Sequence, residues 1–258
     1  MAKAFDAEGF CNFYAGNYKR SAMAFDSAAL IWKKANRLSY FKSLNDEANA
    51  LMYHSEYHKA LLAFFECLTI TNELGDKTST GKVLNNIGLV YESIGDADKA
   101  IFYEKRSLAY KMMSKDALSL ARTYGNIGEA FSNKEMPDSA ILYEQLSYKL
   151  YRSKNDKGGM AIALGDIGNM YKKKNKIDSA ISYLTRAVAI SQKLSNAENT
   201  ANIEDDLAQG YMLKHDLKNT WKYASAAEVF VPQITDYEFL QQHAKLMYQY
   251  FKQQGNAA

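Results

Sequence analysis

Apolar, small and polar positions recur along this chain in a fixed order, and the whole pattern repeats. Residues 84–91 read Leu-Asn-Asn-Ile-Gly-Leu-Val-Tyr, and similar segments return at 124–131 and 164–171, so the period is forty. Turn residues such as Gly95-Asp96 divide a period in two, and others such as Gly75-Asp76 separate successive periods. Each period therefore predicts two helices joined by a short turn.

Thirteen helices are expected from this pattern. They are predicted near residues 2–15, 18–35, 37–54, 57–74, 77–94, 97–114, 117–134, 137–154, 157–174, 177–195, 197–215, 217–231 and 234–254. Paired, they form repeats at approximately 2–36, 37–75, 76–115, 116–155, 156–195 and 196–232, followed by a half-repeat or capping helix at 234–254. That last helix matches the first helix of a further repeat. It is either a cap or a sign that the chain is a fragment of a longer protein, and we favour the fragment.

One column of the repeat holds only small residues. Its members are Gly9, Ala48, Gly88, Gly128, Gly168 and Ala208. Small side chains let helix backbones approach closely, and large side chains fill the space beside them. An aromatic column supplies that bulk. Its members are Tyr91, Phe131, Tyr171 and Tyr211. The pattern predicts an all-α repeat solenoid in which each repeat packs against its neighbours.

These columns resemble those of the tetratricopeptide repeat, a family of paired antiparallel helices. The resemblance covers essentially the whole chain and implies a single right-handed superhelical solenoid over residues 1–258. The period of forty exceeds the family's usual length of about 34 residues, and the proline that often ends the family's repeat is absent. A longer repeat is typical of a branch that includes spindle-orientation adaptors and peptide-sensing bacterial regulators. The segments 73–77 and 84–88 are also similar to sensor regions of Bacteroidetes-type bacterial regulators.

Composition excludes several classes of protein. With 47% hydrophobic and 24% charged residues the chain is an ordinary globular one, and its net charge of +3 is too small for a nucleic-acid footprint. The apolar runs are too short to span a membrane. The first residues predict an amphipathic helix rather than a signal peptide. Cytoplasm and periplasm both stay open, because two cysteines that are expected to be buried tolerate either redox state. Cys11 and Cys67 lie far apart in the sequence and suit neither a disulfide framework nor a zinc site.

We find no motif that predicts catalysis, a metal or a cofactor. The segment 54–58 holds two histidines, but it lacks the order of a helical zinc motif and fits a solvated turn. Cys67 occupies a column of small residues, and Cys11 is expected to be buried because Phe10 and Phe13 flank it. His243 is isolated, so a surface or partly packed position is expected.

Two other sets of residues have a structural and a functional interpretation. The nineteen tyrosines could stack on nucleic-acid bases, but most fall in packing columns, such as Tyr103, Tyr143, Tyr183 and Tyr223, so we favour core packing. The lysine run at 172–174 closes a predicted helix. There a solvated helix end is favoured over a docking patch, because cations suit the helix macrodipole.

The resemblance places a binding groove on the first helix of each repeat, where it implies an extended peptide. The matching polar positions lie two and six residues before the column glycine, and one residue after it. On this basis the candidate peptide-binding residues are Lys42, Lys82, Asn86, Arg122, Asn126, Asp166 and Asn169. Segment 122–128 is very similar to the adaptor branch, in which the matching Arg and Asn contact carboxylates and backbone amides of the ligand. Asparagine both donates and accepts hydrogen bonds, and arginine can grip a carboxylate with two.

The alternative for these columns is a solvated helix face with local Lys–Asp pairs, which contribute little to stability. If the groove does bind, basic residues in the N-terminal half and acidic ones in the C-terminal half predict a peptide of mixed charge. Its acidic extended segment would lie against Lys42, Lys82 and Arg122. The leading hypothesis is a non-enzymatic protein- or peptide-binding scaffold, the sensor or adaptor part of a larger bacterial protein. The second is self-assembly through the solenoid ends or helix 234–254. No nucleic-acid partner, membrane insertion or cofactor is expected.

Overall fold

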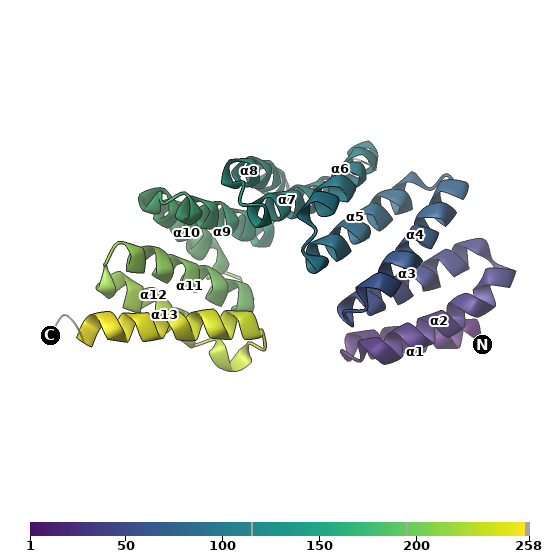
Figure 1. Cartoon of the computed structure of the whole chain (residues 1–258), viewed down its shortest axis with the longest axis horizontal. Helices are drawn as coiled ribbons and strands as arrows, with labels where there is room; N and C mark the ends of the chain where they lie inside the picture. Colours follow the sequence, from purple (N-terminus) through teal and green to yellow (C-terminus); the bar gives the residue numbers. More distant parts are fainter. Residues whose placement is uncertain (115, 195, 256–258) are drawn as a thin grey trace. The chain divides into compact units, whose positions relative to one another are not determined.

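The computed structural model describes residues 1–114, 116–194 and 196–255 of the chain (Figure 1). The described residues form thirteen α-helices and one short 3-10 helix, and they contain no strand. In chain order the elements are α1 (Ala2–Tyr14), α2 (Tyr18–Ala35), α3 (Arg37–Tyr53), α4 (Tyr57–Glu73), α5 (Lys77–Ile94), α6 (Ala97–Ser114), α7 (Ala117–Asn133), α8 (Pro137–Ser153), α9 (Lys157–Lys173), α10 (Ile177–Ser191), α11 (Ala197–Leu213), α12 (Leu217–Glu228), η1 (Val231–Gln233) and α13 (Tyr237–Gly255). All the predicted helices are present, which confirms the all-α solenoid of paired helices.

Most predicted helix ends agree closely with the structure, but three do not. α10 ends at Ser191 and α12 at Glu228, both earlier than predicted, and α13 begins only at Tyr237. Between α12 and α13 the chain forms the 3-10 helix η1, which contains Pro232. Proline has no N–H to continue a helical ladder, so it separates these two helices.

The first helix of a repeat begins at an Asn or Asp in several repeats. The side chains of Asn36, Asp76, Asp156 and Asn196 each accept a hydrogen bond from the backbone N–H three residues later, at 2.8–3.0 Å. Such a cap satisfies an N–H that the helix leaves open, and it stabilises the helix by about 1 kcal/mol. An N-cap residue therefore recurs with the period and marks where the first helix of a repeat begins.

The turn inside each repeat also recurs in one backbone conformation. Ser55, Gly95, Glu135, Asn175 and His215 are each one period apart, and all have φ between 56° and 85°. This left-handed conformation lets the chain reverse within a few residues at the end of the first helix. Glycine adopts it without strain, yet only Gly95 of the set is a glycine.

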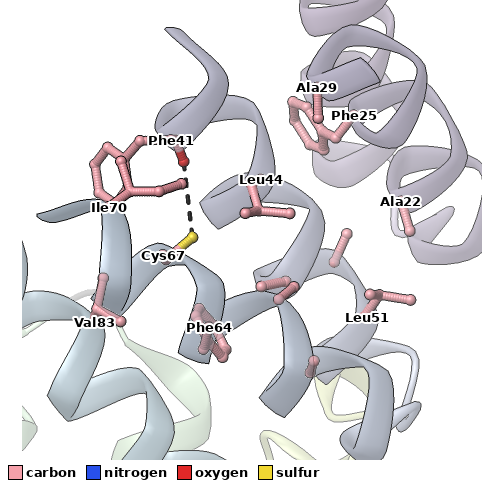
Figure 2. Packing of buried hydrophobic residues seen from close by; sticks show 14 of the residues in the cluster. Ala22, Phe25, Ala29, Phe41, Leu44, Leu51, Phe64, Cys67, Ile70 and Val83 are labelled. Atoms are coloured by element: carbon pink, nitrogen blue, oxygen red, sulfur yellow. Dashed lines mark hydrogen bonds between the residues drawn. The ribbon is translucent and has the colours of Figure 1, made fainter. Parts of the chain in front are cut away.

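The helices form two compact units, unit 1 (Met1–Asp116) and unit 2 (Ala117–Ala258). In unit 1 each helix from α1 to α6 packs on the next. Its core joins apolar residues of α2 to α5, with Phe25, Phe64 and Ile70 fully buried (Figure 2). Cys67 is buried in the same core, where its thiol lies 3.9 Å from the carbonyl oxygen of Phe41. It is the small packing residue that its column predicts.

Unit 2 contains the helices from α7 to α13, and here too each α-helix packs on its successor. Leu184 of α10 and Leu207 of α11 are fully buried at the centre of its main apolar cluster. α13 packs against both α11 and α12, and Phe239, Leu246 and Tyr250 bury its apolar face.

The aromatic columns pair inside the repeats. Stacked rings with centroids 5.3–5.6 Å apart join Tyr91 to Tyr103, Phe131 to Tyr143, Tyr171 to Tyr183 and Tyr211 to Tyr223. Each pair links the two helices of one repeat, and the spacing in the sequence is the same in all of them. These tyrosines therefore pack within the repeats, as we favoured over base stacking.

A side chain of the paired helix packs against the glycines of the small column and leaves little room for a larger residue. A Cβ added at Gly9 would lie 2.6 Å from Phe25, and one added at Gly168 would lie 2.6 Å from Cγ of Leu184. A Cβ at Gly128 would lie 2.6 Å from Oε1 of Glu144. All of these distances are shorter than real Cβ contacts, so a larger residue at Gly9 or Gly168 would force its partner side chain to shift, whereas at Gly128 the flexible end of Glu144 would have to move.

Two expectations about single residues are wrong. Cys11 is exposed, although Phe10 and Phe13 flank it. Phe10 itself is 43% exposed, so the aromatic neighbours do not form a pocket around the thiol. His243 is buried at 4% exposure between two carboxylates, because α13 turns it towards α11 and α12.

Candidate functional site

A groove of about 650 Å³ lies within unit 2, over the first helices of its repeats. α7, α8 and α9 provide most of its lining, α11 adds Asp206, and α13 adds Glu238. The lining includes charged and amide side chains, and Gly125 and Gly128 add no side chain on α7. A volume of this size accommodates several residues of an extended chain or one small molecule.

Four predicted site residues lie together in this groove. Arg122 and Asn126 come from α7, one helical turn apart on the same face, and Asp166 and Asn169 come from α9. Asp166 lies one period after Asn126, so these two residues occupy equivalent positions in neighbouring repeats. The structure thus brings these four residues into one lining.

The other three predicted residues belong to unit 1. Lys42 is on α3 and Lys82 on α5, and both side chains are exposed. Asn86 of α5 donates a hydrogen bond from its amide nitrogen to Oδ1 of Asn49 at 3.2 Å. The amides of neighbouring repeats therefore bond to each other here, as a ladder of asparagines can.

Asp206 is held by the protein's own side chains. Asn169 donates to its Oδ2 at 2.7 Å, and Lys172 donates to its Oδ1 at 2.9 Å and to Oε1 of Gln209 at 3.0 Å. The positive charge of Lys172 neutralises this carboxylate, and the side chains of both residues are largely buried. Asn169 uses its amide nitrogen in this network, while its Oδ1 is buried without a hydrogen-bond partner among the residues that the structure describes.

Glu144 is a groove residue that the sequence analysis missed. It lies on α8, is only 3% exposed, and lines the groove beneath Gly125 and Gly128. One period later, Leu184 occupies the equivalent position, and Ala224 follows it. In the sequence, the sign that could have identified Glu144 is a glutamate in a column that also holds apolar residues.

The centre of the groove is acidic and not neutralised. Burial raises the pKa of Glu144 well above its usual value, and the charges of Asp166 and Glu129 raise it further. Burial likewise raises the pKa of Asp166 to about 7, with Glu129 and Asp206 adding to the shift. Within the described parts of the chain, neither Glu144 nor Asp166 forms a hydrogen bond or an ion pair.

The lysine run at the end of α9 joins repeats to each other. Lys172 binds Asp206, Lys173 donates to Oγ of Ser132 at 2.8 Å, and Lys174 pairs with Asp138. Lys214 repeats the last contact one period later, with Asp178 at 2.6 Å. The run is therefore neither a freely solvated helix end nor an open docking patch.

The described residues hold no cluster of His, Cys, Asp and Glu that could bind a metal ion. None of the helices, over the residues described, is both long and apolar enough to cross a membrane.

A model of the tetratricopeptide repeat matches residues 81–111 and 161–194. The two matches begin two periods apart, and one falls in each unit. The remaining repeats carry the same column of small residues, and the aromatic columns recur in the repeats at 116–155 and 196–232. A search of curated proteins gave no significant match.

Solved structures share the fold at low sequence identity. BtubC from P. vanneervenii has a TM-score of 0.74 and 16% identity, covering 85% of this chain and 93% of its own. A signal-transduction ATPase with a tetratricopeptide repeat sensor, from Pyrococcus horikoshii, has a TM-score of 0.78 and 15% identity, covering 96% of this chain and 38% of its own. The apo form of the quorum sensor NprR from B. thuringiensis has a TM-score of 0.74 and 14% identity, covering 97% and 70%.

These identities show the fold alone, and the narrower likeness to regulators of the Bacteroidetes type stays a prediction. The periodic columns, the two matched segments and the helix-pair architecture agree with one another. The chain carries tetratricopeptide repeats and folds as a solenoid of that kind.

Proposed function

We propose that the chain is a non-enzymatic scaffold that binds an extended segment of a protein or peptide in the groove of unit 2. One observation carries this proposal: the resemblance to the tetratricopeptide repeat selected Arg122, Asn126, Asp166 and Asn169 from the sequence, and all four line one groove. A solvated helix face would not need a concave surface that gathers guanidinium, amide and carboxylate groups. Tetratricopeptide solenoids are typically scaffolds rather than enzymes.

The groove chemistry suits a peptide of mixed charge. Arg122 is exposed and forms no ion pair within the described residues, so its guanidinium is available for a carboxylate of the ligand. Asn126 carries both a donor and an acceptor, the two kinds of group that a peptide backbone pairs with. On unit 1 the exposed Lys42 and Lys82, with Asn86, remain separate candidates for contact with an acidic segment.

Two of the similar structures support a sensing or adaptor role within a larger protein. One contains a tetratricopeptide repeat sensor as part of an ATPase, and the other is a quorum sensor. In both, the matched part makes up only a portion of a longer chain. We propose the same kind of role for this solenoid, with the bound segment as the signal.

A selection from a random peptide library tests the groove. Peptides of about 12 residues, long enough to exceed the groove, would be selected on the immobilised chain and measured by calorimetry. The double variant Arg122→Ala, Asn126→Ala is expected to bind at least about tenfold more weakly, because it loses a charged and a neutral hydrogen-bonding group. Circular dichroism would confirm that its helices remain.

A matched control removes one guanidinium and one amide elsewhere in unit 2. Arg152 of α8 and Gln241 of α13 are exposed and lie outside the groove lining. The double variant Arg152→Ala, Gln241→Ala should bind like the wild type. Equal binding by both double variants would contradict a groove site.

Self-assembly is a second candidate, and the surface of α13 favours it. Tyr248 is 66% exposed and Phe251 is 54% exposed on that helix. Tyr248 stands where the preceding repeats have a small buried residue. Light scattering should then show a mass that rises with concentration and falls to the monomer in the variant Tyr248→Ser, Phe251→Ser. A constant monomer mass would reject this candidate.

A further inference from the structure

Glu144 and Asp166 are neighbouring acidic groups of the groove, and the protein supplies no partner for either within the part of the chain that the structure describes. Three cationic side chains line the same groove: Arg122, Lys172 and Lys173. Lys172 is bound to Asp206 and Gln209, and Lys173 is bound to Ser132. Arg122 forms no ion pair with any described residue. The groove's own cations therefore leave both acids without a counter-charge.

The carboxylate of Glu144 reaches the groove beside two glycines of α7. Its Oε1 would lie 2.6 Å from a Cβ at Gly128 and 3.9 Å from a Cβ at Gly125. Because both positions of α7 lack a side chain, the carboxylate is deeply buried among protein atoms and still lines the groove. Asp166, on the facing helix α9, is only partly buried.

The fold does not require an acid at this position. One period earlier, Glu104 of unit 1 is buried against Gly88, and one period later Leu184 occupies the equivalent site against Gly168 and is fully buried. An apolar residue thus satisfies the packing, whereas a buried carboxylate without a partner costs stability. A costly group that packing does not need marks a functional site.

We propose that Glu144 and Asp166 form a subsite for one cationic group, the ammonium or guanidinium of a lysine or arginine in the bound segment. The two carboxylates supply acceptors from facing helices, and a metal ion is disfavoured because the described residues offer no third ligand. Charge complementarity selects a basic residue over a neutral one. This inference rests on the proposed function and adds a specificity to it: the ligand needs a basic residue beside its acidic segment.

The test uses a library-selected peptide whose binding depends on Arg122 and Asn126. Each lysine of the peptide is replaced by norleucine, and each arginine by citrulline. Affinities are then measured with the wild type and with the double variant Glu144→Gln, Asp166→Asn. For one basic residue, replacement should weaken wild-type binding by about 30-fold or more, the usual effect of removing one side of a buried charge pair. The same replacement should cost the double variant about twofold or less.

Three controls separate a charge effect from a folding effect. Glu198 is exposed and outside the groove, so Glu198→Gln should behave like the wild type. Gly125→Ala adds a methyl group with ordinary contacts, 3.7 Å from Ser147 and 3.9 Å from Glu144, and should reduce the preference for the basic residue by covering the carboxylate. Melting curves would confirm that each variant is folded.

The outcomes distinguish this inference from the proposed function. If peptides bind through Arg122 and Asn126 but no basic residue is coupled to Glu144 and Asp166, the subsite is wrong and the groove proposal stands. If no peptide depends on Arg122 and Asn126, both fail. Spermidine carries the same cationic groups as a free amine. Spermidine could bind the wild type and not the double variant, while no peptide shows the coupling. That result would show that the subsite binds a free amine and not a side chain of the bound segment.

Discussion

At the scale of single residues, Glu144 has opposite consequences for binding and for stability. Its carboxylate is buried at 3% exposure and has no partner within the described residues, so ionising it in the folded state is costly. Gly128 accommodates this side chain, and Gly168 accommodates Leu184 in the same way one repeat later. The repeat thus tolerates either chemistry, and Glu104 of unit 1 is a buried acid against Gly88 one period before Glu144.

Replacing this acid should stabilise unit 2. We expect Glu144→Gln to raise the free energy of unfolding at pH 8 by about 1–3 kcal/mol, because it removes a buried charge and keeps the shape. Since the folded-state pKa of Glu144 lies above its unfolded value, protonation stabilises the fold below the unfolded pKa. That contribution is lost as pH rises through the folded pKa. Urea unfolding at pH 5 and pH 8 should therefore show a larger gain at pH 8, and an equal gain or a loss at pH 8 would contradict the account.

Two glycines of α9 should respond in opposite directions to alanine. A Cβ at Gly165 would lie 3.6 Å from Ile203, an ordinary contact, so Gly165→Ala should stabilise the helix by about 0.5–1 kcal/mol. A Cβ at Gly168 would lie 2.6 Å from Cγ of Leu184, so Gly168→Ala should cost about 1–3 kcal/mol. Thermal melts of the two variants check this pair. A lower melting temperature for both would show that glycine at 165 has another role.

The sequence predicts part of the groove for a definite reason. The resemblance gives the groove positions, and the period carries them from Arg122 and Asn126 to Asp166 and Asn169, because equivalent positions on successive repeats face the same surface. Pairing is harder to predict: Lys172 and Asp206 come from different repeats, and only the packed helices show that they neutralise each other. Glu144 was missed because it lies on α8, the second helix of its repeat, whereas the predicted groove positions all lie on first helices.

At the scale of helices, the period predicts starts better than ends. Capping residues such as Asp76 and Asn196 specify where a helix begins, since their side chains bond a defined N–H. The ends of α10 and α12 have no comparable signal. α13 begins later than predicted because Pro232 and the turns around it form η1 first.

α13 is held to its neighbours by an ion-paired histidine. Nδ1 of His243 lies 2.7 Å from Oδ1 of Asp205 on α11, and Nε2 lies 2.5 Å from Oε2 of Glu228 on α12. The ring of Phe239 stacks on the imidazole at 5.7 Å. Only the imidazolium form can donate to both carboxylates. The hydrogen bond with Asp205 accordingly raises the pKa of His243, against the effect of burial.

Docking of α13 should therefore weaken as pH rises. A histidine with a raised folded-state pKa contributes stability that is fully present below its unfolded pKa of about 6.5 and is lost as pH rises through the folded value. Amide exchange in residues 237–255 should be slower at pH 6 than at pH 9, after correction for intrinsic rates. His243→Phe should remove this difference. If wild-type protection of α13 does not change with pH, or if the variant keeps the change, the histidine does not act in this way.

At the scale of the whole molecule, the small column keeps its period from Gly88 in unit 1 to Gly128 in unit 2. This continuity supports our proposal that residues 1–258 are one array of repeats. In such an array each repeat is stabilised by its own core and by its immediate neighbours, so stability is close to a nearest-neighbour sum. The contacts within each unit agree, because helices pack mainly on the next helix in the chain.

A cavity in one repeat should then be felt only nearby. Phe64 of α4 and Leu207 of α11 are both fully buried, and replacing either by alanine should cost about 2–5 kcal/mol of local stability. Hydrogen exchange followed by mass spectrometry should show faster exchange in α3 to α5 for Phe64→Ala and in α9 to α12 for Leu207→Ala. Each variant serves as the control for the other. If both variants accelerate exchange along the whole chain, unfolding is globally cooperative, and stability is not a sum over neighbours.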